Sequence, residues 1–126
     1  MLPSKLCELY CNGNRITEFD SLPNSLELLD CDQNEIKSLN NLPNNLKKLC
    51  CSGNHIKSLD LLPNSLEVLC CSHNNYLTQL DFLPSSLKFL DCGHCMITSL
   101  DCLPEKLEEL YCYENPYITM LDKLPS

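Results

Sequence analysis

Residues 22–41 read LPNSLELLDCDQNEIKSLNN, and the rest of the chain repeats this stretch. The shared pattern is LPxxLxxLxCxxNxIxxLxx, and only two single-residue insertions interrupt it. A period near 20 residues predicts a solenoid, in which each repeat is one small unit that stacks on the next. We expect one domain, residues 1–126. Its six predicted repeats are 2–21, 22–41, 42–61, 62–82, 83–102 and 103–123, and residues 124–126 begin a truncated seventh.

The apolar residues of one repeat alternate with outward-facing residues over a short segment. Leu29 and Cys31 alternate with Leu28 and Asp30. This alternation predicts a strand that points Leu29 and Cys31 into the core. Because consecutive repeats run in the same direction, their strands must form a parallel sheet. On the opposite side the repeat has no room for a full helix, and the Leu-Pro pair favours polyproline-like or 3₁₀ segments.

One polar position follows the strand in nearly every repeat. Asn34 lies where the chain turns away from the strand. A buried amide there can bond the backbone groups of its own turn and of the neighbouring turns. We therefore interpret the position as structural. Its members form a predicted ladder of Asn14, Asn34, Asn54, Asn74, Cys95 and Asn115.

The chain contains 11 cysteines, and that number alone would suggest a disulfide-rich secreted protein. Their placement indicates otherwise, because six of them occupy a single repeat position at the end of the predicted strand. Cysteines in such a column are small buried hydrophobic residues, and this use favours a reducing compartment. The column consists of Cys11, Cys31, Cys51, Cys71, Cys92 and Cys112.

The composition is that of an acidic folded protein. Hydrophobic residues make up 44% of the 126-residue chain, and the formal net charge is −8. No apolar run is long enough to cross a bilayer, and Met1 does not begin a recognisable signal peptide. Phosphate binding needs a concentrated basic surface, whereas Lys47-Lys48 is only a basic pair. The sequence thus predicts a soluble protein with no nucleic-acid or membrane partner, whose acidic surface either keeps the chain soluble or steers a basic partner.

The repeat resembles the leucine-rich-repeat family, whose core pattern is LxxLxLxxNxL. All six copies match that core, with Cys in place of the third Leu. The short repeat and its Leu-Pro connector are similar to the bacterial class found in effectors injected into host cells. The pattern LPNSLxxLxCxxNxIxSLDxLP is also similar to repeat proteins of giant viruses of amoebae. Cys95 departs from the family's Asn, and Cys is an accepted substitute at this position.

This resemblance implies a fold and a function. The fold class is an α/β-type solenoid, mostly β: a curved right-handed coil with one short parallel strand per 20–21 residues and little or no α-helix on its convex side. The implied function is non-catalytic binding of a partner protein, such as a host protein, on the concave strand face, in the cytoplasm of the producing or infected cell. Bacterial effectors with ligase activity carry it in a separate domain after the repeats, and this sequence shows no such segment. We therefore expect no enzyme activity and no cofactor.

The outward strand positions are where the predicted concave face differs from repeat to repeat. They mix charged residues with aromatic and aliphatic ones, which is the composition of a protein-binding patch. Alternatively, leucine-rich repeats tolerate β-forming residues on this face without any binding role. The predicted partner-binding residues are Tyr10, Leu28, Asp30, Lys48, Val68, Phe89, Asp91, Tyr111 and Tyr113.

A second candidate surface lies along the edge where the strands end. Both insertions follow the ladder position directly, as Asn75-Tyr76 and as Pro116-Tyr117. Each insertion is expected to push a tyrosine outward, with Met96 between them. The predicted edge patch is therefore Tyr76, Met96 and Tyr117, although harmless loop variation gives the same pattern.

Metal and redox chemistry find little support in the pattern. His55, His73 and His94 come from successive repeats and could share a metal with a nearby cysteine, but they occupy different columns, and we interpret them as solvated side chains. The stretch Cys92-Gly93-His94-Cys95 has the CxxC spacing, yet the repeat register sends both thiols into the core. We therefore expect no metal site.

The first and last repeats look unlike the polar caps that close most solenoids. Residues 1–3 begin directly in register, and residues 124–126 open another repeat. Exposed strand edges at both ends would favour association. The alternative function is therefore a structural or self-associating repeat, either running on head to tail or closing as a dimer.

Overall fold

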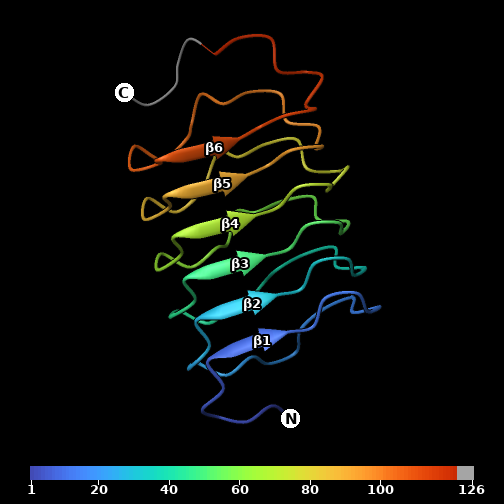
Figure 1. Cartoon of the computed structure of the whole chain (residues 1–126), viewed down its shortest axis with the longest axis vertical. Helices are drawn as coiled ribbons and strands as arrows, with labels where there is room; N and C mark the ends of the chain where they lie inside the picture. The colour runs from blue at the N-terminus through green and yellow to red at the C-terminus, as the bar shows by residue number, and fades with distance from the viewer. Residues whose placement is uncertain (122–126) are drawn as a thin grey trace.

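The computed structural model describes residues 1–121, which form a single stack of short strands (Figure 1). Neighbouring strands run parallel and pair in chain order in one sheet. The described residues contain no helix, and so none that could span a membrane. The predicted parallel-strand solenoid is confirmed. Its strands are β1 (Glu8–Tyr10), β2 (Leu28–Asp30), β3 (Lys48–Cys50), β4 (Val68–Cys70), β5 (Phe89–Asp91) and β6 (Glu109–Tyr111).

The end of the predicted sixth repeat and the seventh repeat, residues 122–126 together, lie outside the described residues. Within the described part, each repeat position stacks on the same position of the next repeat. The middle residue of every strand is a leucine, and these leucines pair directly across the sheet. The column is Leu9, Leu29, Leu49, Leu69, Leu90 and Leu110.

A proline-initiated turn leads into each strand. Pro23 has no N–H to donate, but its carbonyl accepts the Leu26 N–H at 3.1 Å, which closes a tight turn. The same bond recurs in the other five repeats at 3.2 Å. The described residues contain no 3₁₀ segment, so the expectation of 3₁₀ structure is corrected to single turns. A single turn is sufficient because the next N–H, from Glu27, already joins the sheet by donating to the Cys7 carbonyl at 2.8 Å.

The core is a column of layers, one layer per repeat. In the second repeat Leu26, Leu29, Cys31 and Ile36 are all fully buried. Equivalent side chains from the third, fourth and fifth repeats are buried to the same degree. In the first repeat Leu9 remains partly exposed, because β1 has only β2 as a neighbour. Each layer thus depends on the layers beside it for the burial that stabilises it.

The buried asparagines link adjacent layers through the backbone. Asn34 Nδ2 donates to the carbonyls of Cys11 at 3.1 Å and Cys31 at 3.0 Å. Asn34 Oδ1 accepts the Ile16 N–H at 3.0 Å. One amide therefore forms hydrogen bonds with backbone groups of two successive repeats, and these groups have no partner in the strand pairing. Asn54, Asn74 and Asn115 make the corresponding bonds.

Asn14 differs from the buried members of the predicted ladder. Its side chain is exposed, and Asn14 Nδ2 donates to the Cys11 carbonyl at 2.9 Å within its own repeat. The expectation of a buried amide is wrong here, because no earlier layer supplies backbone groups for Asn14 to bind.

Cys95 can replace asparagine because the preceding repeat carries an insertion. The Cys95 thiol donates to the Cys71 carbonyl at 3.4 Å. In the other buried ladder positions the Asn Oδ1 also accepts a backbone N–H from the preceding repeat, and a thiol is a poor acceptor for such a bond. The N–H in question belongs to Leu77, and it donates to the Asn74 carbonyl at 3.1 Å in the turn formed by the inserted residue. The insertion therefore removes the need for an acceptor at position 95.

Replacing a ladder asparagine by cysteine should be costly where no insertion precedes it. Asn54→Cys should lower the free energy of unfolding by about 1–3 kcal/mol, because the Ile36 N–H loses its acceptor in a buried site. Urea unfolding followed by circular dichroism measures the loss. Asn14→Cys is the matched control, and its effect should stay within about 0.5 kcal/mol. Equal losses in the two variants would contradict this role for the ladder.

Candidate functional site

The parallel register arranges the outward strand residues into two columns, which together with Tyr113 we call the strand face. The first residues of the strands pair from Glu8 to Glu109, and the third residues pair from Tyr10 to Tyr111. All nine predicted partner-binding residues lie on this face. The first column is Glu8, Leu28, Lys48, Val68, Phe89 and Glu109, and the second is Tyr10, Asp30, Cys50, Cys70, Asp91 and Tyr111.

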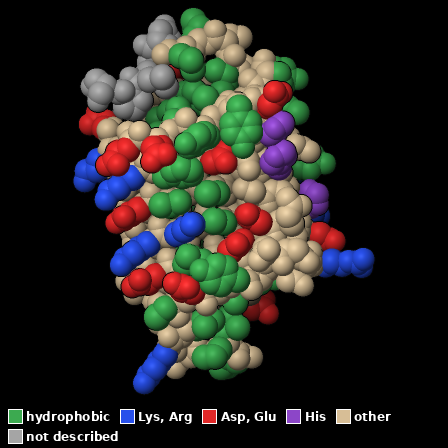
Figure 2. All heavy atoms as spheres, viewed as in Figure 1, with side chains coloured by type: hydrophobic (Ala, Val, Ile, Leu, Met, Phe, Trp, Pro, Cys, Tyr) green, Lys and Arg blue, Asp and Glu red, His purple; other side chains and the backbone are tan. Residues whose placement is uncertain are grey.

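Apolar side chains form a stripe along the strand face, which Lys48 interrupts between Leu28 and Val68. Figure 2 shows them gathered over the strands, where no other element of the described residues 1–121 covers the sheet. Phe89 packs against Tyr111 with ring centroids 5.4 Å apart, and Tyr111 remains 47% exposed. Leu28 and Val68 are only partly buried in the same column. The stripe is therefore available for contact with another molecule.

Alternating charges flank one side of this stripe (Figure 2). They come from the residue just before each of the strands β2 to β6, so opposite charges meet in neighbouring repeats. Lys47 Nζ lies 3.5 Å from a Glu27 carboxylate oxygen, and Lys88 Nζ lies 3.7 Å from one of Glu67. Exposed pairs of this kind add little stability. Their effect is to give the apolar stripe a polar border.

Carboxylates and a tyrosine border the other side of the stripe. Asp32 Oδ1 accepts the Ser52 N–H at 2.7 Å, and partial burial raises the pKa of the Asp32 carboxyl. Asp91 Oδ1 accepts the Gly93 N–H at 3.1 Å. The Tyr113 hydroxyl donates to the other Asp91 oxygen at 3.5 Å. These backbone and side-chain bonds hold the carboxylates at fixed places beside the stripe.

Gly93 allows Tyr113 to take its place on the strand face. A Cβ at position 93 would lie 2.3 Å from the Tyr113 ring, so any larger residue must move that ring. The ring also packs edge-on against His94, with centroids 5.3 Å apart. The sequence offered no signal for this arrangement except that the position is glycine in one repeat only.

Two of the three residues of the predicted edge patch are exposed. Tyr76 is 58% and Tyr117 59% exposed, and Met96 is partly buried. Both tyrosines sit on the inserted turns, which are closed by the bonds from Leu77 N–H to the Asn74 carbonyl and from Ile118 N–H to the Asn115 carbonyl. The Tyr76 ring lies near His55 and Lys57 of the third repeat.

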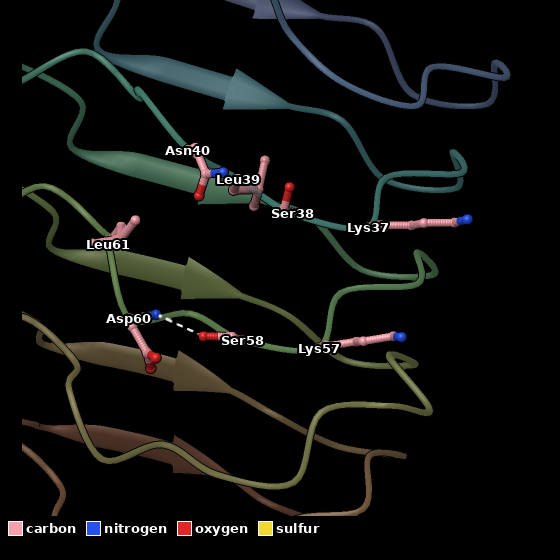
Figure 3. A pocket seen from close by; sticks show the side chains of 8 residues that line it. All are labelled: Lys37, Ser38, Leu39, Asn40, Lys57, Ser58, Asp60 and Leu61. Carbon is pink, nitrogen blue, oxygen red and sulfur yellow. Dashed lines mark hydrogen bonds between the residues drawn. The ribbon is translucent and has the colours of Figure 1, made fainter.

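Two lysines that sequence reasoning missed lie near Tyr76. Lys57 Nζ is 5.8 Å from the Tyr76 ring centroid, and these residues line a hollow of about 320 Å³ together with Lys37 and His55. Lys37 and Lys57 also line a neighbouring hollow of about 430 Å³, in which their side chains extend side by side (Figure 3). Their shared repeat position was the only available signal.

The three histidines do not come together. The expectation of different columns is wrong for His73 and His94, which hold the same repeat position and stack with ring centroids 4.3 Å apart. His55 holds another position and lies against Tyr76, with ring centroids 6.4 Å apart. Among the residues that the structure describes, no three His, Cys, Asp or Glu side chains are placed to share a metal ion. Cys92 and Cys95 of the CxxC stretch are buried, and burial raises the pKa of the Cys92 thiol to about 12. Neither thiol is placed for redox chemistry.

Comparisons with known proteins agree with this geometry. Residues 44–85 match the family model "Leucine Rich repeats (2 copies)". The structure is similar to an effector leucine-rich-repeat domain from Shigella, with 28% sequence identity and a TM-score of 0.80, over 89% of this chain and 50% of that one. It is also similar to YopM from Yersinia enterocolitica, with 34% identity and a TM-score of 0.68, over 90% of this chain and 30% of YopM. The chain thus spans half or less of the length of either structure. No curated protein matched the sequence.

The Gly93 contact can be tested without disturbing the core. Gly93→Ala should displace the Tyr113 ring and weaken its contact with His94, while the urea midpoint changes little because Tyr113 is exposed. Loss of the ring-current shift on the His94 protons in NMR spectra would report the displacement. His94 resonances identical to those of the unmodified protein would contradict the contact.

Proposed function

Because the chain is a leucine-rich-repeat protein with short repeats, we propose that it is a non-catalytic module that binds a partner protein on its strand face. The leucine-rich-repeat fold is in general an interaction scaffold. The observation that carries the proposal is the apolar stripe through Phe89 and Tyr111 on a sheet face that no other part of the described chain covers.

A bare parallel sheet is unusual in itself. Parallel strands are normally covered on both faces, because their connections place other elements there. Here every connection returns on one side of the sheet, which leaves the other side open (Figure 1). An apolar centre with a polar border on each side matches the anatomy of protein interfaces. Phe89 and Tyr111 are the expected anchors, because large aromatic side chains are common among the few residues that carry most of the binding energy of an interface.

The charges bordering the stripe favour a basic partner. Asp30, Asp91 and Asp32 lie on one side, and the whole chain carries a formal charge of −8. Complementary charge raises the association rate and orients the encounter. We expect the partner to present lysines or arginines around an apolar anchor. The likeness to bacterial effector domains supports a host protein as that partner and the cytoplasm as the site of action.

The anchors can be tested with paired double variants. Phe89→Ala with Tyr111→Ala should weaken binding at least about 100-fold, because truncating one aromatic anchor removes about 2 kcal/mol or more and the effects of two touching residues do not simply add. The partner is first captured from host lysate and identified, and the affinity is then measured with purified protein by calorimetry. Circular dichroism checks that the variant folds.

The edge patch supplies the matched control for this experiment. Tyr76→Ala with Tyr117→Ala removes two exposed tyrosines of similar size and should leave the affinity unchanged. The opposite result, with only the edge variant impaired, would move the binding site to the edge patch. Self-association through the terminal repeats, the alternative function, would appear in light scattering as a mass that grows with concentration.

The acidic border should act mainly on the association rate. Asp30→Asn with Asp91→Asn should slow association several-fold at low salt and change the dissociation rate little. The difference should vanish near 1 M salt, where charges are screened within about 3 Å. Stopped-flow kinetics over a salt series gives both rates. A dissociation rate that changes more than the association rate would argue against steering.

A further inference from the structure

Two cysteines occupy the centre of the strand face without serving the core. In the second column, the other members are tyrosine or aspartate, whereas β3 and β4 place Cys50 and Cys70 there. The core position is filled in each case by the following residue, Cys51 or Cys71, which is fully buried. Cys50 and Cys70 are partly exposed, so packing alone does not explain them.

The sheet register places these two cysteines next to each other on the strand face. Cys50 is the direct partner of Cys70 across the parallel pair β3 and β4. Both side chains point to the same face, since they hold the same position in their strands. Neighbouring strands lie about 4.8 Å apart, which falls inside the Cα range of disulfides, about 4.4–6.8 Å. The backbone spacing therefore suits a disulfide between these two residues.

The two thiols also interact and differ in acidity. A side-chain hydrogen bond from Cys50 lowers the pKa of the Cys70 thiol, and the same bond raises the pKa of Cys50. The positive charge of Lys48 favours the thiolate form of both cysteines, and desolvation opposes it in both. The Asp32 carboxylate also opposes the thiolate form of both cysteines, and Asp91 opposes that of Cys70. We assign the attack to Cys70, whose pKa this hydrogen bond lowers, and the resolving step to Cys50, and the paired geometry allows a bond in either order.

Burial separates this pair from the adjacent core cysteines. Cys51 and Cys71 stack with the same repeat spacing, but desolvation holds the pKa of both thiols well above the usual value, and no reagent reaches them in the folded state. The exposed Cys7 and Cys102 lie outside the strand face, on other repeat positions. Among the described cysteines, Cys50 and Cys70 are thus the two that are both accessible to solvent and paired with each other across neighbouring strands.

We propose that Cys50 and Cys70 form a reversible dithiol–disulfide site that reacts with low-molecular-weight disulfides. The Cys70 thiolate attacks one sulfur of the small disulfide, forms a mixed disulfide and releases one small thiolate. Cys50 loses its proton to solvent and attacks Cys70 Sγ, which releases the second small thiolate. The protein dithiol is oxidised by two electrons, and the small disulfide is reduced to two thiols. The chemistry is independent of the proposed partner binding.

The site can be tested by trapping the folded protein in a redox buffer. Reduced protein is equilibrated with oxidised and reduced glutathione, quenched with iodoacetamide and weighed by mass spectrometry. The expected product has lost two hydrogen atoms and has two cysteines protected from alkylation. After trypsin, the bond should join residues 49–57 to 58–88, with fragmentation placing it at Cys50 and Cys70. Dithiothreitol should reverse it fully.

Single variants distinguish the attacking cysteine from the resolving cysteine. Cys50→Ser should leave Cys70 as a stable glutathione adduct, because the resolving thiol is gone. Cys70→Ser should react at least tenfold more slowly. The double variant Cys7→Ser with Cys102→Ser should form the internal bond as the unmodified protein does. A bond between Cys51 and Cys71, separate glutathione adducts on Cys50 and Cys70, or alkylation of both Cys50 and Cys70 in the folded protein would each overturn the proposal.

Discussion

The buried asparagine amide is the interaction on which the rest of the structure depends. A three-residue strand pairs few backbone groups, and the chain must then turn away within the core. Asn34 and its equivalents bind the carbonyls and the N–H that this turn leaves unpaired, in their own repeat and the one before. Without such bonds the turn would bury unsatisfied backbone, and so short a repeat could not stack.

This dependence explains where the repeat can vary. The inserted residue before Leu77 builds a turn that satisfies its own N–H, and the next repeat can then use Cys95 instead of asparagine. Two departures from the pattern, in neighbouring repeats, are therefore one structural event. The insertions also place Tyr76 and Tyr117 on the surface. An insertion that the backbone hydrogen bonds tolerate therefore also changes the side chains exposed on the molecular surface.

The same repeat divides its residues between stability and recognition. Inward positions barely change from layer to layer, because each must fit the layers beside it. Outward strand positions are free of that constraint, and they carry the aromatic stripe, its charged borders and the Cys50–Cys70 pair. The similarity to bacterial effector repeats concerns the shared inner frame. The proposed binding and thiol chemistry rest on the outer residues that are particular to this chain.

The repeat period by itself determined the fold, the strand register and the core of this protein, because in a solenoid each position in one copy stacks on the same position in the next. The repeat register also places His73 in the column of His94 and Gly93 in the column of Tyr113, but tertiary structure decided how these side chains meet. The His73 and His94 rings stack, the Tyr113 ring lies over Gly93, and His55 lies beside Tyr76 instead of a residue of its own column. These contacts depend on side-chain rotamers and turn geometry, about which a periodic pattern carries no information.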